Sequence, residues 1–157
     1  MGQEIEHKFL VDAKQLGSVI EDPGVRLTQG YLSERPVVRV RLAEGADATA
    51  QAWITIKGPG LLARAEYEYP VPPHDAREML ALCAHVILKT RRHVYIGGHT
   101  WDLDEFHGAL QGLWLAEIEL PAAGADFERP AWVTDEVTDD ARYANVALAR
   151  ATEIPPR

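Results

Sequence analysis

Close to the start of the chain stands Gln3-Glu4-Ile5-Glu6-His7-Lys8-Phe9-Leu10-Val11, whose pattern of charged and apolar residues returns in later segments. Side chains of a β-strand alternate between two faces, so Glu4, Glu6 and Lys8 fall together on one of them. The other face carries Ile5, His7 and Phe9. Taken alone, this strand would fit the ordinary pattern in which a polar face looks at water. The same charged pattern recurs in later strands, which argues for a different arrangement.

Seven more segments have the alternation and the bordering turn residues that are typical of strands. They cover residues 25–33, 37–44, 50–57, 63–71, 86–96, 99–107 and 113–120. Most of them place two charged or polar side chains two residues apart on one face: Arg39 and Arg41, Thr55 and Lys57, Glu66 and Glu68, Lys89 and Arg91, Asp102 and Asp104, and Glu117 and Glu119. Helical segments are predicted at residues 13–20, 74–84 and 140–151.

Composition predicts a single domain that spans residues 1–157. The chain is 46% hydrophobic, which suits one core, and its length is too short for two comfortable domains. A net charge of -8 argues against nucleic acid as the main partner, because that partner requires a basic surface. No apolar run is long enough for a membrane helix, and the start of the chain lacks a signal-peptide pattern. The single Cys83 suits a reducing compartment, so we expect a cytoplasmic protein without membrane contact.

The predicted strands and their short connections favour a mainly β (α+β) fold, an eight-stranded antiparallel barrel in which closure removes exposed strand edges. If the charged faces pointed outward, apolar side chains would fill the interior and the helices would have little to cover. If the charged faces point inward, the apolar faces need covering from outside. The three helical segments can supply that cover. We therefore predict a tunnel with a charged interior and a few helices packed outside.

A charged interior is costly unless it surrounds water, metal ions and a charged ligand, because each unpaired buried ion costs several kcal/mol. Clustered carboxylates bind hard cations such as Mg2+ or Mn2+ through oxygen. Arginine forks and lysine point charges bind phosphate oxygens. Together these residue types indicate a metal-bound polyphosphate as the ligand.

The ordered series of charged pairs resembles the CYTH proteins, also called triphosphate tunnel metalloenzymes. Residues 4–11 are similar to the ExExK strand of that family. The resemblance continues through residues 29–32, 39–41, 55–57, 66–68, 89–91, 102–104 and 117–119 and ends at 142–145, so it covers nearly the whole chain. His7 and Arg92 depart from the usual pattern. Both are expected on outer faces, so neither affects the tunnel.

The resemblance implies a tunnel that hydrolyses or rearranges a triphosphate with Mg2+ or Mn2+, using two ions during turnover. One ion would grip the phosphates and the other would generate the nucleophile from water. The expected metal ligands are Glu4, Glu6, Glu66, Glu68, Asp104, Glu117 and Glu119. The expected phosphate-binding residues are Lys8, Arg39, Arg41, Lys57, Lys89 and Arg91. Catalytic roles are assigned to Glu4, Glu6, Lys8, Lys89 and Glu119.

Two further residues are assigned positions by their place on a strand face. Asp104, besides its place among the metal ligands, is expected to orient a basic residue or water. His93 follows Lys89 and Arg91 on their face, which would bring it close to ligand near a tunnel mouth. Surface or core roles are assigned to the histidines at 74, 85, 99 and 107.

The leading functional prediction is an inorganic triphosphatase that cleaves tripolyphosphate to pyrophosphate and phosphate. The chain adds little beyond the barrel, as in the short bacterial members of the family. A class IV adenylate cyclase and a nucleoside or thiamine triphosphatase stay open, although no adenine-reading motif is evident. The alternative of another class is a non-catalytic module that binds polyphosphate, but added carboxylates would work against pure phosphate capture. The expected partner is a small triphosphate, and a homodimer is left open.

Overall fold

The computed structural model describes residues 2–60 and 63–157, with side chains described for residues 5–60 and 64–157. Its strands are β1 (Gly2–Val11), β2 (Val25–Glu34), β3 (Val37–Glu44), β4 (Ala50–Lys57), β5 (Ala63–Val71), β6 (Val86–Ile96), β7 (His99–Phe106), β8 (Trp114–Glu119) and β9 (Val133–Glu136). Its helices are α1 (Pro73–Ala81) and α2 (Asn145–Arg150), with the 3-10 turns η1 (Ala13–Gln15), η2 (Gly17–Glu21), η3 (Gly108–Leu110) and η4 (Ala141–Tyr143). None of these helices is long and apolar enough to cross a membrane.

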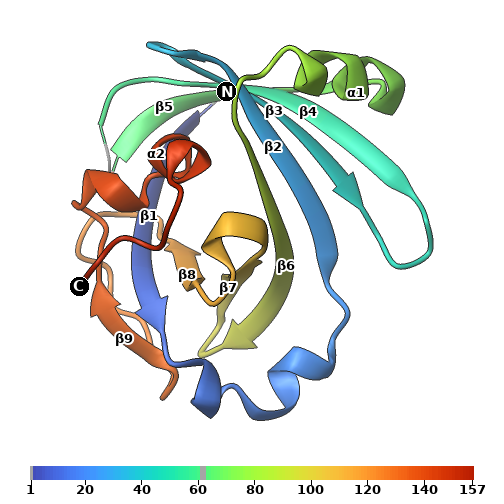
Figure 1. The fold of residues 1–157 in the computed structure, drawn as a ribbon. Helices are drawn as coiled ribbons and strands as arrows, with labels where there is room; N and C mark the ends of the chain where they lie inside the picture. Colours follow the sequence, from blue (N-terminus) through green and yellow to red (C-terminus); the bar gives the residue numbers. More distant parts are fainter. Residues whose placement is uncertain (1, 61–62) are drawn as a thin grey trace.

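The strands form one antiparallel sheet that curls into a barrel-like tunnel (Figure 1). Along the sheet the order is β5-β4-β3-β2-β6-β7-β8-β1-β9. One edge of β1 pairs with β8, and the first residues of its other edge pair with β5, which brings the two ends of the strand order together. The predicted mainly antiparallel tunnel is therefore confirmed.

The strand β9 was not expected from the sequence. It pairs with the later part of β1, where Phe9 lies opposite Glu136 and Val11 opposite Val133. At this level β5 no longer pairs with β1, so β9 takes over the free edge and satisfies its backbone groups. A strand of four residues is too short for alternation to reveal it.

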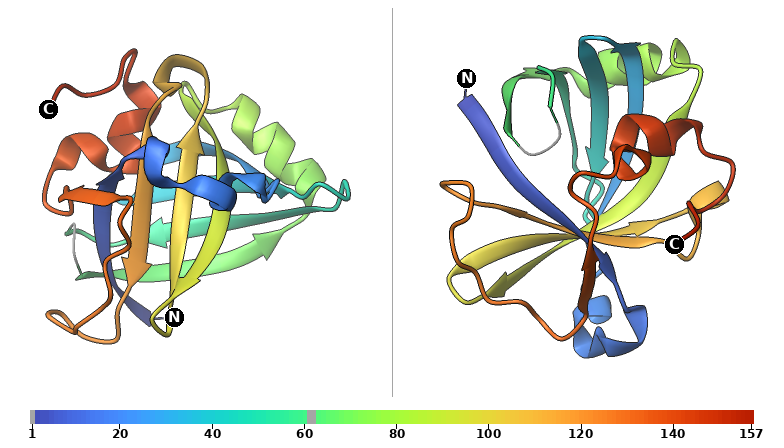
Figure 2. Two further views of the ribbon diagram at one scale, coloured as in Figure 1. Left: turned by 90° about the horizontal axis from the view of Figure 1, so that it is seen from below. Right: turned by 90° about the vertical axis from the view of Figure 1, so that its left-hand side faces the viewer.

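The outer face of β1, β7 and β8 is apolar and covered. Phe9, Trp101 and Ile118 are completely buried there. Leu16, between η1 and η2, packs against this face, and so does Trp132 just before β9. Figure 2 shows η1 and η2 lying over the strands on one side of the sheet and α1 on another. The prediction that charged faces point inward and apolar faces need external cover is thus confirmed for this half of the sheet.

Helix α1 covers the outer face of β3 and β4. Ala76 and Met79 of the helix pack against Val40, Leu42 and Ala52. The helix ends at Ala81, three residues before the predicted boundary at 84. Pro73 stands in its first turn, where a missing N–H costs nothing.

The predicted helix at 140–151 does not lie outside the sheet, and this part of the prediction was wrong. The segment forms two short pieces, η4 and α2, whose Tyr143 and Leu148 pack with Leu10, Ile87 and Leu115. Those three residues lie on the inward faces of their strands, because they share parity with Lys8, Lys89 and Glu117. Figure 1 shows α2 within the outline of the curled sheet. The C-terminal segment therefore fills one end of the tunnel with apolar side chains.

We predict that Leu148→Ala will destabilise the fold by about 2–5 kcal/mol, the usual cost of a cavity at a buried leucine. Leu148 is 1% exposed, so its side chain is surrounded by protein and not by water. Urea unfolding followed by circular dichroism measures the change. The exposed neighbour Arg150, whose ion pair with Glu34 spans 3.3 Å at the surface, is the control. Arg150→Ala should cost no more than about 1 kcal/mol. Equal losses in the two variants would contradict a buried plug.

Candidate active site

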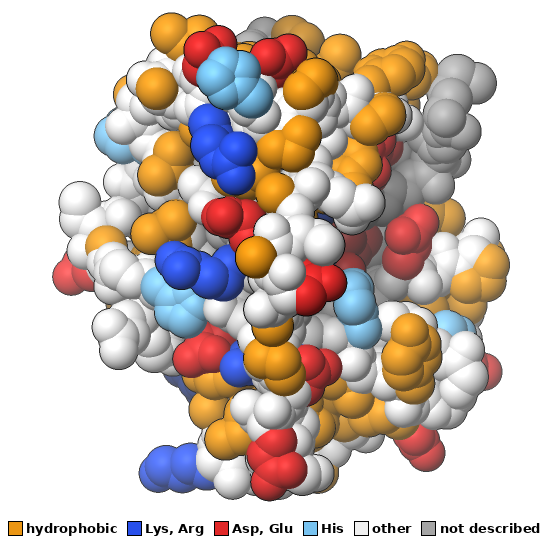
Figure 3. All heavy atoms as spheres, turned by 90° about the vertical axis from the view of Figure 1, so that its right-hand side faces the viewer, with side chains coloured by type: hydrophobic (Ala, Val, Ile, Leu, Met, Phe, Trp, Pro, Cys, Tyr) orange, Lys and Arg blue, Asp and Glu red, His pale blue; other side chains and the backbone are white. Residues whose placement is uncertain are grey.

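The part of the tunnel that is not filled by apolar side chains forms a cavity of about 600 Å³. Figure 3 shows a hollow on one face of the molecule, with acidic side chains in and beside it. Charged residues from most strands line the cavity: Glu6, Arg39, Arg41, Lys57, Glu66, Glu68, Arg91, Asp102, Glu117 and Glu119. The alternation that placed these residues on inward faces thus brings them around one space.

The two arginines of β3 have neutral hydrogen-bond partners. Arg39 donates from Nη2 to Oγ1 of Thr55 over 3.1 Å, and Arg41 donates from Nε to Oε1 of Gln29 over 2.7 Å. Burial, and after it the charges of Arg39 and Arg91, lower the pKa of Arg41 to about 9. Among the described side chains, neither of these arginines forms an ion pair with a carboxylate, although the charge of Asp104 opposes the lowering of the Arg41 pKa.

A second basic group is built around one buried carboxylate. Asp104 accepts hydrogen bonds from Arg91 through both oxygens, at 2.7 and 2.8 Å, and its Oδ2 lies 2.7 Å from Nζ of Lys89. Arg91 and Asp104 are direct partners on β6 and β7. Burial opposes ionisation of Asp104, but the two cations outweigh it and lower its pKa to about 2. Burial lowers the pKa of Lys89 to about 7, against the opposing effect of Asp104.

Lys8 joins the first strand to the C-terminal segment. Its Nζ donates to the backbone carbonyl of Tyr143 over 2.9 Å and lies 3.7 Å from Oε1 of Glu117. Glu117 is buried, yet the positive charges of Lys8, Arg91 and Lys89 hold its pKa below the ordinary value. Lys8 itself lines a small hollow beside the main cavity, together with Glu6 and Arg64.

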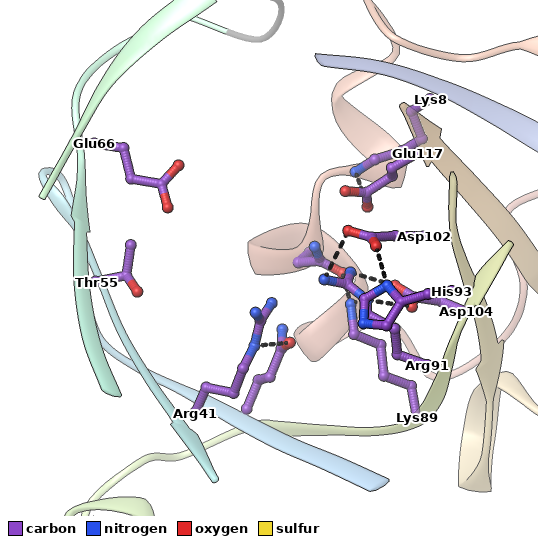
Figure 4. Close-up of polar contacts among 12 residues, drawn as sticks. Lys8, Arg41, Thr55, Glu66, Lys89, Arg91, His93, Asp102, Asp104 and Glu117 are labelled. Atoms are coloured by element: carbon purple, nitrogen blue, oxygen red, sulfur yellow. Dashed lines mark hydrogen bonds and ion pairs between the residues drawn. The ribbon is translucent and has the colours of Figure 1, made fainter. Parts of the chain in front are cut away.

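Carboxylates from two walls face the cavity. Glu6 and Glu119 are direct partners on β1 and β8, an arrangement in which like charges repel unless a cation accompanies them. Glu66 and Glu68 come from β5. Figure 4 shows Glu66 and Thr55 on the wall that faces Glu117 and Asp102, with Arg41 reaching into the space between.

The carboxylate oxygens fit a hard divalent cation whose coordination is completed by water and by substrate phosphate. Within the described side chains, no three His, Cys, Asp or Glu residues are close enough to hold a metal ion by themselves. Mg2+ usually keeps several waters and takes only one or two carboxylates together with substrate phosphates. The paired Glu6 and Glu119 supply oxygen ligands of that kind. Glu4, also assigned to metal, lies outside the residues whose side chains are described.

Most of the residues assigned from the sequence come together, but at two depths. Arg39, Arg41, Lys57 and Arg91 line the main cavity with the glutamates. Lys89 and Asp104 lie in the wall behind it, almost without exposure. His93 is at the exposed rim, where its Nδ1 lies 2.8 Å from Oδ1 of Asp102. The structure tests the placement of these side chains; their roles stay predictions.

Sequence reasoning missed Arg64, Asn145 and His99. Arg64 shares the inward face of Glu66 and Glu68 and lines hollows beside the cavity, so the alternation of β5 could have identified it. Asn145 lines the main cavity from the start of α2, and its Oδ1 lies 3.4 Å from Nζ of Lys89. His99, which was assigned a surface or core role, lines the cavity at the turn between β6 and β7. Asn145 belongs to the resemblance at residues 142–145, where it was expected to anchor the final helix, but no local pattern places Asn145 or His99 in the cavity.

A tunnel of antiparallel strands with charged pairs facing inward is the architecture of the CYTH domain, and the chain belongs to that family. The family model for the CYTH domain matches residues 2–150. The inorganic triphosphatase of Acetivibrio thermocellus is 39% identical over 155 residues, which cover 96% of this chain and 95% of that protein. The inorganic triphosphatase of Nitrosomonas europaea is 38% identical over 154 residues, covering 93% and 96%.

Solved structures agree with this assignment. The crystal structure of the inorganic triphosphatase NE1496 superposes with a TM-score of 0.62 at 30% identity and covers 99% of both chains. HpAC1 from Hippeastrum superposes with a TM-score of 0.53 at 15% identity, covering 76% of this chain and 80% of that one. At that identity the likeness concerns the fold alone.

We predict that Asp104→Asn will lower the free energy of unfolding near neutral pH by roughly 3–5 kcal/mol, because two buried cations lose their counter-charge. The pKa of Asp104 is lowered from 3.8 to about 2 in the folded protein. Its stabilisation is therefore complete above the unfolded value and disappears as the pH falls through the folded one. Urea unfolding near neutral pH and again near pH 2 should show that the difference between variant and wild type shrinks in acid.

The control for this measurement is Asp135→Asn, because the side chain of Asp135 is 73% exposed. We expect this surface change to stay within about 1 kcal/mol at either pH. An undiminished deficit of Asp104→Asn in acid would show that the loss does not come from the ionised carboxylate.

Proposed function

We propose that this chain hydrolyses inorganic triphosphate to pyrophosphate and phosphate with the help of a divalent cation. The observation that carries the proposal is the cavity in which a basic wall, whose Arg39 and Arg41 have neutral hydrogen-bond partners, faces carboxylates from other strands. Pure phosphate capture would gain nothing from added negative charge, whereas metal-bound triphosphate needs both. The names of the two curated relatives support the same activity.

The cation, Mg2+ or Mn2+, would be held by Glu6 and Glu119, with Glu4 and with Glu66 or Glu68 as further oxygen ligands. When bound, it would neutralise phosphate charge and make water a better nucleophile at neutral pH. The proposal includes two ions during turnover. Asp104 is a weaker choice as a ligand, because both of its oxygens already accept from Arg91 and one contacts Lys89.

The basic residues would bind the phosphate chain and stabilise charge as it develops. Water attacks a terminal phosphorus, the bond to the bridging oxygen breaks, and pyrophosphate leaves with the negative charge. Arg91 is fixed by the two hydrogen bonds that it donates to Asp104, and its Nη1 lies 3.2 Å from Oδ2 of Asp102. A guanidinium held in this way needs little rearrangement in the transition state. Such preorganised positive charge is the main contribution of a protein to phosphoryl transfer.

The filled end of the tunnel favours a compact substrate. Tyr143 and Leu148 occupy that end, and Lys8 is tied to the carbonyl of Tyr143. A triphosphate can lie along the charged part of the interior, whereas a bulky group on one end would have to remain towards the open rim. A cytoplasmic location and a small-molecule partner fit this use and are part of the proposal.

The test is phosphate release from tripolyphosphate and from ATP in parallel assays, with Mg2+, with Mn2+ and with chelator. We expect metal-dependent turnover of tripolyphosphate and little release from ATP. Glu6→Gln should lower kcat/KM about a hundredfold or more, the order lost when one electrostatic group at a reacting centre is removed. The exposed Glu153→Gln is the matched control and should retain wild-type kinetics.

Other outcomes would redirect the proposal. Formation of cyclic nucleotide and pyrophosphate from ATP would identify a cyclase. Faster turnover of ATP or thiamine triphosphate than of tripolyphosphate would identify an organic triphosphate as substrate. Tight binding of tripolyphosphate without any turnover would leave a binding module.

A further inference from the structure

We propose that Gln29 is a positioning residue, which holds the guanidinium of Arg41 through a neutral amide so that its full positive charge remains available to substrate phosphate. The inference rests on the proposed function. It extends that function to Gln29, which acts on phosphate only through Arg41. Gln29 does not line the cavity and had no role in the assignments made from the sequence.

The contact fixes both side chains. Gln29 on β2 is 0% exposed and lies directly opposite Arg41 on β3. Its Oε1 accepts from Nε of Arg41 over 2.7 Å. Because Nε can only donate, the orientation of the amide is determined, with oxygen towards the arginine. In Figure 4 the terminal nitrogens of Arg41 point into the space between the walls.

A carboxylate would be the stronger anchor, and the same tunnel uses one elsewhere. Asp104 contacts Arg91 and Lys89 at 2.7 to 2.8 Å, and its negative charge partly neutralises theirs. The bond to Gln29 is assisted by the charge of the arginine alone, whereas a carboxylate would add its own charge to the attraction. Among the described side chains, Arg41 has no carboxylate within ion-pair distance. The amide of Gln29 therefore holds Arg41 less strongly than a carboxylate would, but it does not neutralise the positive charge of the guanidinium.

The other end of the amide does not explain the glutamine. Its Nε2 has no partner within hydrogen-bond distance among the described residues, which is unfavourable for a buried polar atom. A leucine of similar size would avoid that cost. Gln29 does act on the neighbouring Tyr31, where burial raises the pKa of the hydroxyl and the side chain of Gln29 has a smaller, opposite effect. The amide is accounted for by what its oxygen does for Arg41.

The neighbouring arginine is held in the same way. Thr55 on β4 is 0% exposed, lies directly opposite Arg39, and accepts from its Nη2 over 3.1 Å. The hydroxyl of Thr55 in turn donates to Oε1 of Glu68 over 3.3 Å, so a carboxylate lies behind this acceptor. Both arginines of β3 are thus held directly by uncharged groups, in contrast to the basic residues of β6. The wall formed by β3 keeps its charge for the ligand.

The experiment measures tripolyphosphate affinity by calorimetry in the presence of chelator, so that binding is read without metal and without turnover. Gln29→Leu removes the acceptor and should weaken Kd about tenfold, as expected for a hydrogen bond to a charged group. Gln29→Glu keeps an acceptor but neutralises Arg41, and should weaken Kd at least as much while reducing its salt dependence. Gln111→Leu and Gln111→Glu, at an exposed position, are the matched controls and should bind as wild type.

A double-mutant cycle separates positioning from a general structural effect. Lysine has no Nε–H equivalent, so Gln29→Leu should cause no further loss of affinity in an Arg41→Lys background. An additive loss, or wild-type affinity of either Gln29 variant, would overturn the proposal. If the Gln29 variants do not fold, Thr55→Val must weaken Kd in the same direction through Arg39, and its failure to do so overturns it equally. Hydrolysis by the wild type is assayed separately, so absence of turnover with intact binding would reject the proposed function alone.

Discussion

The charged wall of the tunnel depends on the buried carboxylate of Asp104. Lys89 is completely buried and the side chain of Arg91 is 12% exposed, so both charges would be costly without a counter-charge. Asp104 contacts both, and its register on β7 places it directly opposite Arg91. The ion pairs therefore fix the relative positions of β6 and β7 at the level of the cavity. Substrate binding can then act on a basic wall that is already rigid.

On several strands the inward face changes from charged to apolar side chains within two residues. On β6 the inward face changes from Lys89 to Ile87, and on β8 from Glu117 to Leu115. On β1, Leu10 joins the same apolar cluster as these two residues. Because each change occurs within two residues, the sheet itself separates a region that binds ions from a region that excludes water.

Strand alternation carried most of the sequence prediction, because the two-residue period is a local property of the backbone. The inward positions of Arg39, Arg41 and Glu66 followed from it directly. The position of the C-terminal segment did not, since an apolar helix packs equally well on an outer face or in an open tunnel end. Gln29 and Thr55 were visible in the alternation, but only the distances show that each holds an arginine. Asn145 reaches the site through tertiary packing that no neighbouring residue indicates.

The strand β1 is synthesised first, but its hydrogen-bonding partners are synthesised late. Its backbone pairs with β8 and with β9, and the amide of Lys8 donates to Thr138, a residue 130 positions later in the chain. During synthesis on the ribosome, this strand must therefore wait for nearly the whole polypeptide before its edges are satisfied. Contacts of such sequence separation slow folding and leave an unpaired edge exposed in the nascent chain. The alternating charges of Glu4, Glu6 and Lys8 would keep that waiting edge soluble, so the residues assigned to chemistry also protect the chain before any chemistry is possible.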